Sequence, residues 1–104
     1  MSRPANPLRG EASFQINGQD LLLRPSFEHL VAAEEELGSL FALVERASSG
    51  SLTLNEITAL VWHCLATDTR PDRAAVGTAV MAMGLVQATT PVRAILTQAL
   101  QGER

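Results

Sequence analysis

The chain has no lysine, only one cysteine and no long uninterrupted apolar run. A single cysteine, Cys64, excludes an internal disulfide. The longest apolar stretch, residues 74–86, is interrupted by Gly77, Thr78 and Gly84 and is too short to span a bilayer. The first residues contain no apolar segment typical of a secretory signal. We therefore expect a cytoplasmic protein with no membrane partner.

Basic charge is also scarce. The 104 residues carry a net charge of −3, and all eight basic residues are arginine. Residues 28–56 contain six glutamates and only one basic residue, Arg46. Because no basic face is available to meet phosphates, we expect no binding of nucleic acid. An acidic middle segment is suited to steering a basic partner.

No catalytic or metal-binding constellation is visible. The soft metal ligands are His29, His63 and Cys64. His63 and Cys64 are adjacent, so on a helix they point about 100° apart, and no zinc-site spacing is present. Cys64 lies on an apolar stripe, as a buried free cysteine does. The sequence therefore predicts no enzyme, no metal and no cofactor.

The N-terminal part predicts a short tail and then a β-hairpin. Residues 1–8 contain two prolines and no periodicity, which indicates a flexible tail before a single domain at 9–104. Two apolar runs, 14–16 and 21–23, flank Asn17-Gly18, which is typical of a type I′ hairpin turn. An isolated hairpin is marginally stable, so this one must pack on helices or pair with another chain.

After the hairpin, capping residues, apolar stripes and glycine stops predict four to five short helices. The expected ranges are about 27–37, 40–48, 54–66, 70–83 and 91–102. Thr53 and Glu56 predict a capping box, and Pro91 suits the first position of the last helix. The stripe of the first helix is expected to be Phe27, Leu30, Val31 and Leu37. The fold class is thus α+β, mostly α.

Helices three and four carry candidate contacts with a partner: Trp62, Val80, Met81 and Met83. Trp62 lies off the centre of its stripe, so it is either an interface residue or a core filler. Val80 and Met83 lie on one side of the fourth helix and Met81 lies on the other. Such a helix is either sandwiched inside the fold or meets a partner, for which methionine is well suited.

Glu34 is the remaining candidate contact, because it falls near the middle of the expected stripe of the first helix. An unpaired buried carboxylate is costly, so three alternatives are open. Glu34 has a partner such as Arg24 or Arg46, it lies where another protein covers it, or it reaches water at the edge of the stripe. Its neighbours Glu35 and Glu36 are expected to be solvated.

The order of several short motifs is similar to that of a known family. These motifs are Arg9-Gly10-Glu11, Asn17-Gly18, Leu-x-x-x-Glu-x-x-Leu-Gly at 30–38, Ala59-Leu60-Val61-Trp62 before Leu65, Gly84-Leu85, and Ala99-Leu100-Gln101-Gly102. Over about residues 6–102 the chain resembles small tail-assembly proteins of gene transfer agents and tailed phages. These are grouped as tail assembly chaperones and are sometimes described as tail tube proteins. One departure is His63-Cys64, where the family often has a small residue after the tryptophan.

The resemblance implies a non-catalytic chaperone in a bacterial host. Such a protein binds the tape measure protein, keeps it soluble and recruits tail tube subunits. The main alternative is a lasting structural subunit of the tail. Less favoured alternatives are a small enzyme, which would need Glu34 and a histidine in one deep pocket, and a regulatory module. A homo-oligomer stays open as well.

Overall fold

The computed structural model describes residues 12–16, 18–67 and 70–101. Within these residues an antiparallel hairpin, β1 (Ala12–Ile16) and β2 (Gln19–Leu23), is followed by five helices. The helices are α1 (Phe27–Leu37), α2 (Leu40–Ser49), α3 (Leu54–Cys64), α4 (Arg73–Met83) and α5 (Leu85–Gln101). The predicted α+β, mostly α class is therefore confirmed. The expected N-terminal tail, residues 1–8, lies outside the described residues.

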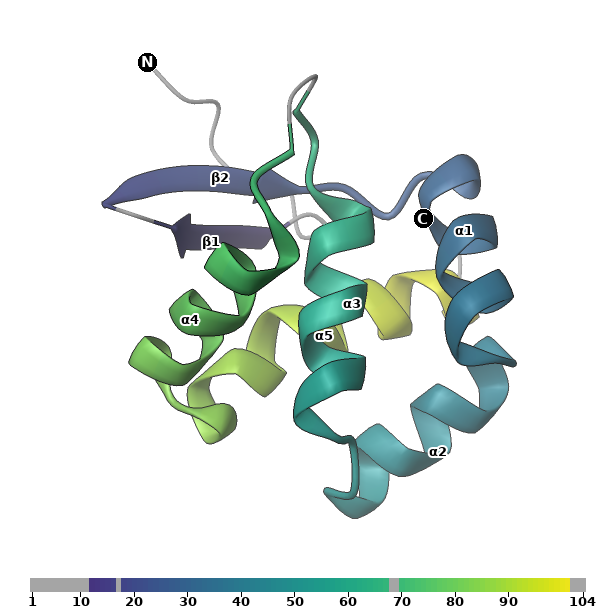
Figure 1. The fold of residues 1–104 in the computed structure, drawn as a ribbon. Coiled ribbons are helices and arrows are strands. Elements are labelled where there is room, and N and C mark those ends of the chain that lie inside the picture. Colours follow the sequence, from purple (N-terminus) through teal and green to yellow (C-terminus); the bar gives the residue numbers. More distant parts are fainter. Residues whose placement is uncertain (1–11, 17, 68–69, 102–104) are drawn as a thin grey trace.

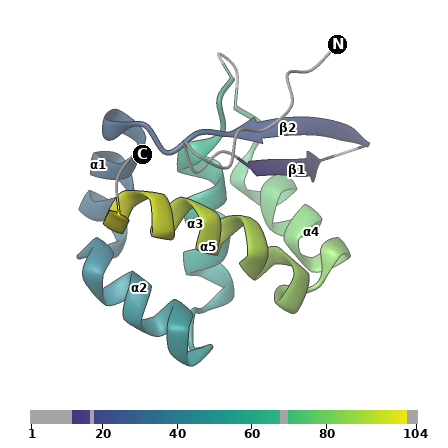
Figure 2. The same ribbon diagram turned by 180° about the vertical axis from the view of Figure 1, so that it is seen from behind.

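Helix α3 is the centre of the domain. Helices α1 and α2 lie on one side of it and α4 lies on the other, while α5 crosses behind (Figure 1 and, from behind, Figure 2). The hairpin covers one end of this arrangement, and β1 packs against α4 and α5. Of the eight positions from Ile57 to Cys64 in α3, all but Trp62 are buried, as a central helix requires.

The hairpin forms as predicted and packs on the helices of its own chain. Its register pairs Ala12 with Leu23 at the open end. Gly18 has a φ of 77°, the positive value that a tight type I′ turn requires, while Asn17 lies outside the described residues. Phe14 and Ile16 are buried on the helix side. This burial supplies the apolar support that a hairpin lacks in isolation.

The segment after α3 pairs with the end of β2. The Arg24 N–H donates to Cys64 O at 2.7 Å, and the Ala66 N–H donates to Leu22 O at 2.8 Å. These bonds hold Leu65 in an extended conformation opposite Leu23. Helix α3 therefore ends at Cys64, two residues before the predicted end, because the backbone pairs with the hairpin instead.

Local capping signals set several other helix ends. Gly38 ends α1 with a φ of 94°, a conformation that favours glycine. The predicted capping box at α3 is confirmed: Thr53 Oγ1 accepts the Glu56 N–H at 3.1 Å, and Glu56 Oε1 accepts the Thr53 N–H at 2.9 Å. Helix α4 begins at Arg73 and not at the predicted 70–71, because Asp72 keeps an extended backbone.

The predicted start of α5 is wrong. The helix begins at Leu85, and Pro91 lies inside it, not at its first position. A proline there removes one backbone hydrogen bond and disfavours the preceding helical turn. Pro91 is buried together with Ala88 and Val92. Tertiary burial of this face therefore outweighs the local cost of the proline.

The predicted stripe of α1 is also partly wrong. Phe27 is 82% exposed and Val31 is exposed too, whereas Ala33 is fully buried and Leu30 and Leu37 pack against the core. At about 100° per residue, Leu30, Ala33 and Leu37 share one face, and Phe27 lies roughly 90° from it. The helix is thus rotated so that a small alanine meets α3 and the large phenylalanine meets solvent.

Membrane-spanning length is not reached by any single helix among the described residues. Helices α4 and α5 reach the required length and apolarity only as a pair, and the pair is bent by 116° at its break.

Candidate protein-binding surfaces

Trp62 is half-buried and held between α3 and the segment that leads into α4. Its indole Nε1–H donates to Pro71 O at 2.9 Å. The guanidinium carbons of Arg70 and Arg73 lie 4.8 and 4.6 Å from the ring centre, within cation–π range. Its polar atom and its ring are therefore used by the protein's own residues. Trp62 thus joins α3 to α4 within the domain and stays partly exposed.

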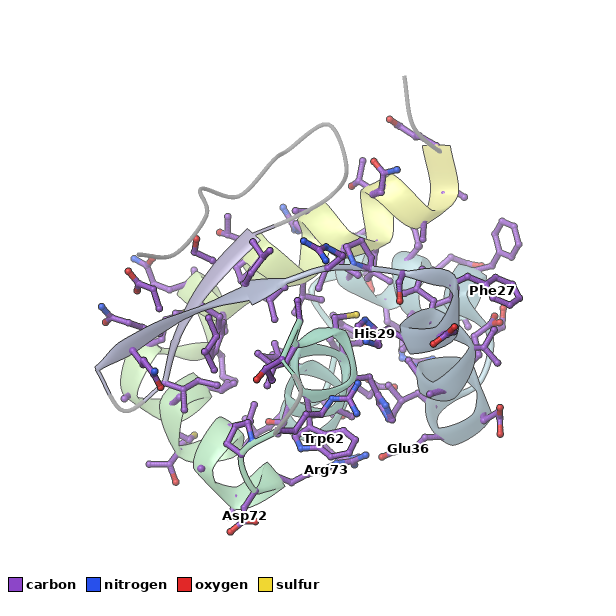
Figure 3. The ribbon with its side chains drawn as sticks, turned by 90° about the horizontal axis from the view of Figure 1, so that it is seen from above. Phe27, His29, Glu36, Trp62, Asp72 and Arg73 are labelled. Atoms are coloured by element: carbon purple, nitrogen blue, oxygen red, sulfur yellow. The ribbon has the colours of Figure 1, made fainter. Side chains whose placement is uncertain are left out.

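Glu36, His63 and Arg73 form a charged cluster that connects α1, α3 and α4. Arg73 binds both carboxylate oxygens of Glu36, and His63 Nε2–H donates to Glu36 Oε1 at 2.8 Å. The hydrogen bonds from Arg73 and then His63 lower the pKa of Glu36 to about 2. Glu36 is exposed, as expected, but its side chain also reaches two other helices, which the sequence analysis did not predict. Figure 3 shows Trp62, Arg73 and Glu36 gathered on one side of the molecule.

Helix α4 has two unlike sides, as its sequence predicts. Met81 is 62% exposed, whereas Met83 is partly buried against the core. Val80 has no exposed surface, so the expectation that Val80 contacts a partner is corrected: it faces the core beside Val76. One side of α4 is therefore packed inside the fold, and the opposite side is exposed to solvent.

An apolar face, here called the α3–α4 face, surrounds Met81. It is a shallow depression lined by the apolar side chains of Leu54, Ala74 and Met81 and by the backbone of Gly77. Leu54 is also partly exposed. Trp62 does not line this depression, so the structure does not bring the two candidates together.

Glu34 lies on a different surface, at the junction of α1 and α2. It is exposed, and its Oε2 accepts the Leu40 N–H at 3.0 Å, which caps the start of α2. Arg46, a suggested partner, pairs instead with Glu56. Of the three alternatives that the sequence left open for Glu34, this geometry agrees with a residue at the edge of the stripe that reaches water.

Glu34 also borders an apolar groove, here called the α2–α5 groove, of about 130 Å³. The other residues that line it are Leu40, Phe41, Val44, Leu96, Ala99 and Leu100. Phe41 is 70% exposed and Leu100 is 51% exposed. A groove with large exposed apolar walls and one carboxylate can bind an apolar side of another polypeptide, and it offers no arrangement for covalent chemistry.

The sequence analysis missed Phe41 as a candidate contact. In α2 the buried stripe is Leu43 and Ala47, with Leu40 and Val44 beside it. Phe41 lies well off that stripe at helical spacing, as Trp62 does in α3. The position of this large aromatic residue away from the apolar stripe was therefore the sequence signal that could have identified Phe41 as a candidate contact.

The described residues contain no group of three or more His, Cys, Asp or Glu side chains able to hold a metal ion. Cys64 is fully buried, and burial raises the pKa of its thiol to about 12. Such a thiol is unreactive at neutral pH.

The fold and its surfaces define a small, mostly helical domain with two separate apolar surfaces. The chain belongs to the family described as phage tail tube protein, GTA-gp10, whose model matches residues 9–102. The resemblance to proteins of gene transfer agent and phage tails is thereby confirmed. No curated protein and no solved structure shows a significant match. The family description names a tail tube protein.

Proposed function

We propose that this protein is a non-catalytic component of a phage-like tail that acts by binding other tail polypeptides. The family match over residues 9–102 carries the proposal. The two surfaces support it, because Phe41, Leu100 and Met81 are all more than half exposed in a domain of this size. Contiguous exposed apolar side chains are typical of protein interaction sites.

The family description favours a lasting structural subunit over a transient chaperone. The description is that of a tail tube protein, and a subunit of the tube would stay in the finished particle. The chaperone role, with the tape measure protein as the partner, is the second candidate. One observation favours it: the acidic surface of α1 and α2 would keep a free subunit soluble. In either role the protein would act in the bacterial cytoplasm, where tails assemble.

Particle composition separates the two roles. Particles are purified from producing cells, and this chain is quantified by mass spectrometry against the other tail proteins in the particle and in the cell extract. A structural subunit is expected at a fixed, high ratio in the particle. A chaperone is expected to be abundant in the extract and scarce in the particle.

Deletion of the gene tests the proposal as a whole. Tailless or abnormal particles are expected on electron microscopy, with rescue by the wild-type chain. Normal tails in the deletion strain, together with absence of the chain from particles, would refute a role in the tail.

A further inference from the structure

The α2–α5 groove continues along both helices beyond Glu34. A second hollow between α2 and α5 shares Val44, Leu96 and Leu100 with the first and extends to Arg93. From Phe41 to Ser48 the groove follows α2 for about 10 Å, or two helical turns. The length and the apolar walls suit one face of a short helix.

An exposed apolar strip of α1 extends the groove at its Glu34 end. Phe27, Val31 and Glu34 are spaced at i, i+4 and i+7, so they share one side of α1. Phe27 is the most exposed of them and projects away from the helices in Figure 3. A helix seated in the groove can therefore find further apolar contact past Glu34.

The charge at the Glu34 end of this surface is acidic, whereas the far end of the second hollow holds a basic side chain, Arg93, which donates to Ala47 O at 3.4 Å. Glu28, Glu34, Glu35 and Glu45 are all exposed, and within the described part of the chain no ion pair joins any of them to a basic residue. The basic residue of α2, Arg46, is bound to Glu56. The Glu34 end of the surface therefore presents exposed carboxylates beside apolar side chains.

We infer that the α2–α5 groove is the docking site for a basic amphipathic helix of another tail protein. Lysine or arginine residues beside the apolar stripe of that helix pair with Glu34 and its acidic neighbours, while the stripe contacts Phe41 and Leu100. The inference rests on the proposed function for the identity of the partner as a tail protein. The groove and its charge define the chemistry of the partner independently of that proposal.

A second copy of this chain is a poorer occupant. Its net charge is −3, and among the described residues the groove offers one basic side chain, Arg93, against four exposed glutamates, so a symmetric contact would leave most of these carboxylates without a basic partner. The apolar α3–α4 face of a second copy offers only Arg73 as a basic residue, and Arg73 already binds Glu36. Charge complementarity thus points to a different polypeptide.

Binding of a model helix tests the chemistry of the groove. The probe is a fluorescein-labelled helical peptide of about four turns with a leucine face flanked by lysines, and its matched peptide has glutamate in place of lysine. Fluorescence anisotropy is expected to show that the glutamate peptide binds at least about tenfold more weakly. Phe41→Ser should weaken binding of the lysine peptide about tenfold, and Val86→Ser, at an even more exposed apolar side chain elsewhere, should have no effect.

The charge contribution has its own variant. Glu34→Gln keeps an oxygen that accepts the Leu40 N–H, so α2 stays capped while the charge is removed. This variant should weaken the lysine peptide about threefold at low salt and by less in high salt, because screening suppresses the ion pair. The inference is overturned if the lysine and glutamate peptides bind equally well to the wild-type protein. It is also overturned if Phe41→Ser and Val86→Ser weaken binding of the lysine peptide by the same factor.

Photo-crosslinking during particle assembly identifies the natural occupant. A photoreactive phenylalanine is placed at position 41 and, as the matched control, at position 86. The expected product at 41 is a peptide of another tail protein with basic residues beside an apolar helical stripe. A product with a second copy of this chain, or tail products only from position 86, overturns the inference and leaves the tail function standing. A basic helix of a protein unrelated to tails, captured at 41, would instead refute the tail function and keep the groove.

Discussion

Replacing Glu36 by glutamine tests whether the charged cluster holds α1, α3 and α4 together. The pKa of Glu36 falls from 4.5 to about 2, chiefly through the hydrogen bonds from Arg73 and His63. A shift of that size corresponds to roughly 3 kcal/mol if taken at full value. The Glu36 side chain is 32% exposed, so solvent screening reduces this to about 1 kcal/mol. We expect Glu36→Gln to lower the free energy of unfolding by about that amount at pH 7.

Glu36→Gln also changes how the free energy of unfolding depends on pH in the acidic range. Because the folded-state pKa is lowered, the stabilisation is complete above about pH 4.5 and is lost as the pH falls toward 2. The difference in stability between wild type and Glu36→Gln should therefore be largest at pH 7 and shrink below pH 4.

Urea unfolding measures both effects, with Trp62 fluorescence as a reporter next to the cluster and circular dichroism as the second probe. In a separate thermal unfolding experiment, a loss of about 1 kcal/mol should lower the melting temperature by roughly 4–8 °C. Glu35→Gln is the matched control, since Glu35 is an exposed neighbour on α1. Equal stability of the two variants at pH 7, or an unchanged difference from pH 7 to pH 2.5, would refute the reasoning.

Three further outcomes are expected. Cys64 should react with Ellman's reagent at pH 8 only on unfolding, because burial raises its pKa to about 12; rapid labelling of the native protein would contradict this. Leu60→Ala, at a fully buried site in α3, should cost about 2–5 kcal/mol in urea unfolding, whereas Val86→Ala, at an 84% exposed site, should stay within about 0.5 kcal/mol. Glu34→Leu removes the acceptor of the Leu40 N–H and should cost about 0.5–1 kcal/mol; a gain in stability by calorimetry would show that this cap is dispensable.

Only part of the candidate site could be predicted from the sequence. Met81 and Glu34 were expected to be available for contact, and both are exposed. The expectation that Val80 contacts a partner was wrong, because Val80 is buried. Periodicity shows that Val80 and Met81 lie on different sides of the helix, but it does not show which side meets the core. Phe41 was missed because its groove is shared between α2 and α5, which are distant in sequence.

The sequence by itself determined the features that depend on a few neighbouring residues: the hairpin, the capping box of Thr53 and Glu56, and the glycine that ends α1. Their hydrogen bonds join residues close in the chain, so local chemistry is sufficient to specify them. The tertiary structure decided the burial of Pro91 within α5 and the pairing of Glu36 with Arg73, 37 positions away. Those outcomes depend on how helices rotate and pack around α3, where burial of an entire face outweighs the preference of any one residue.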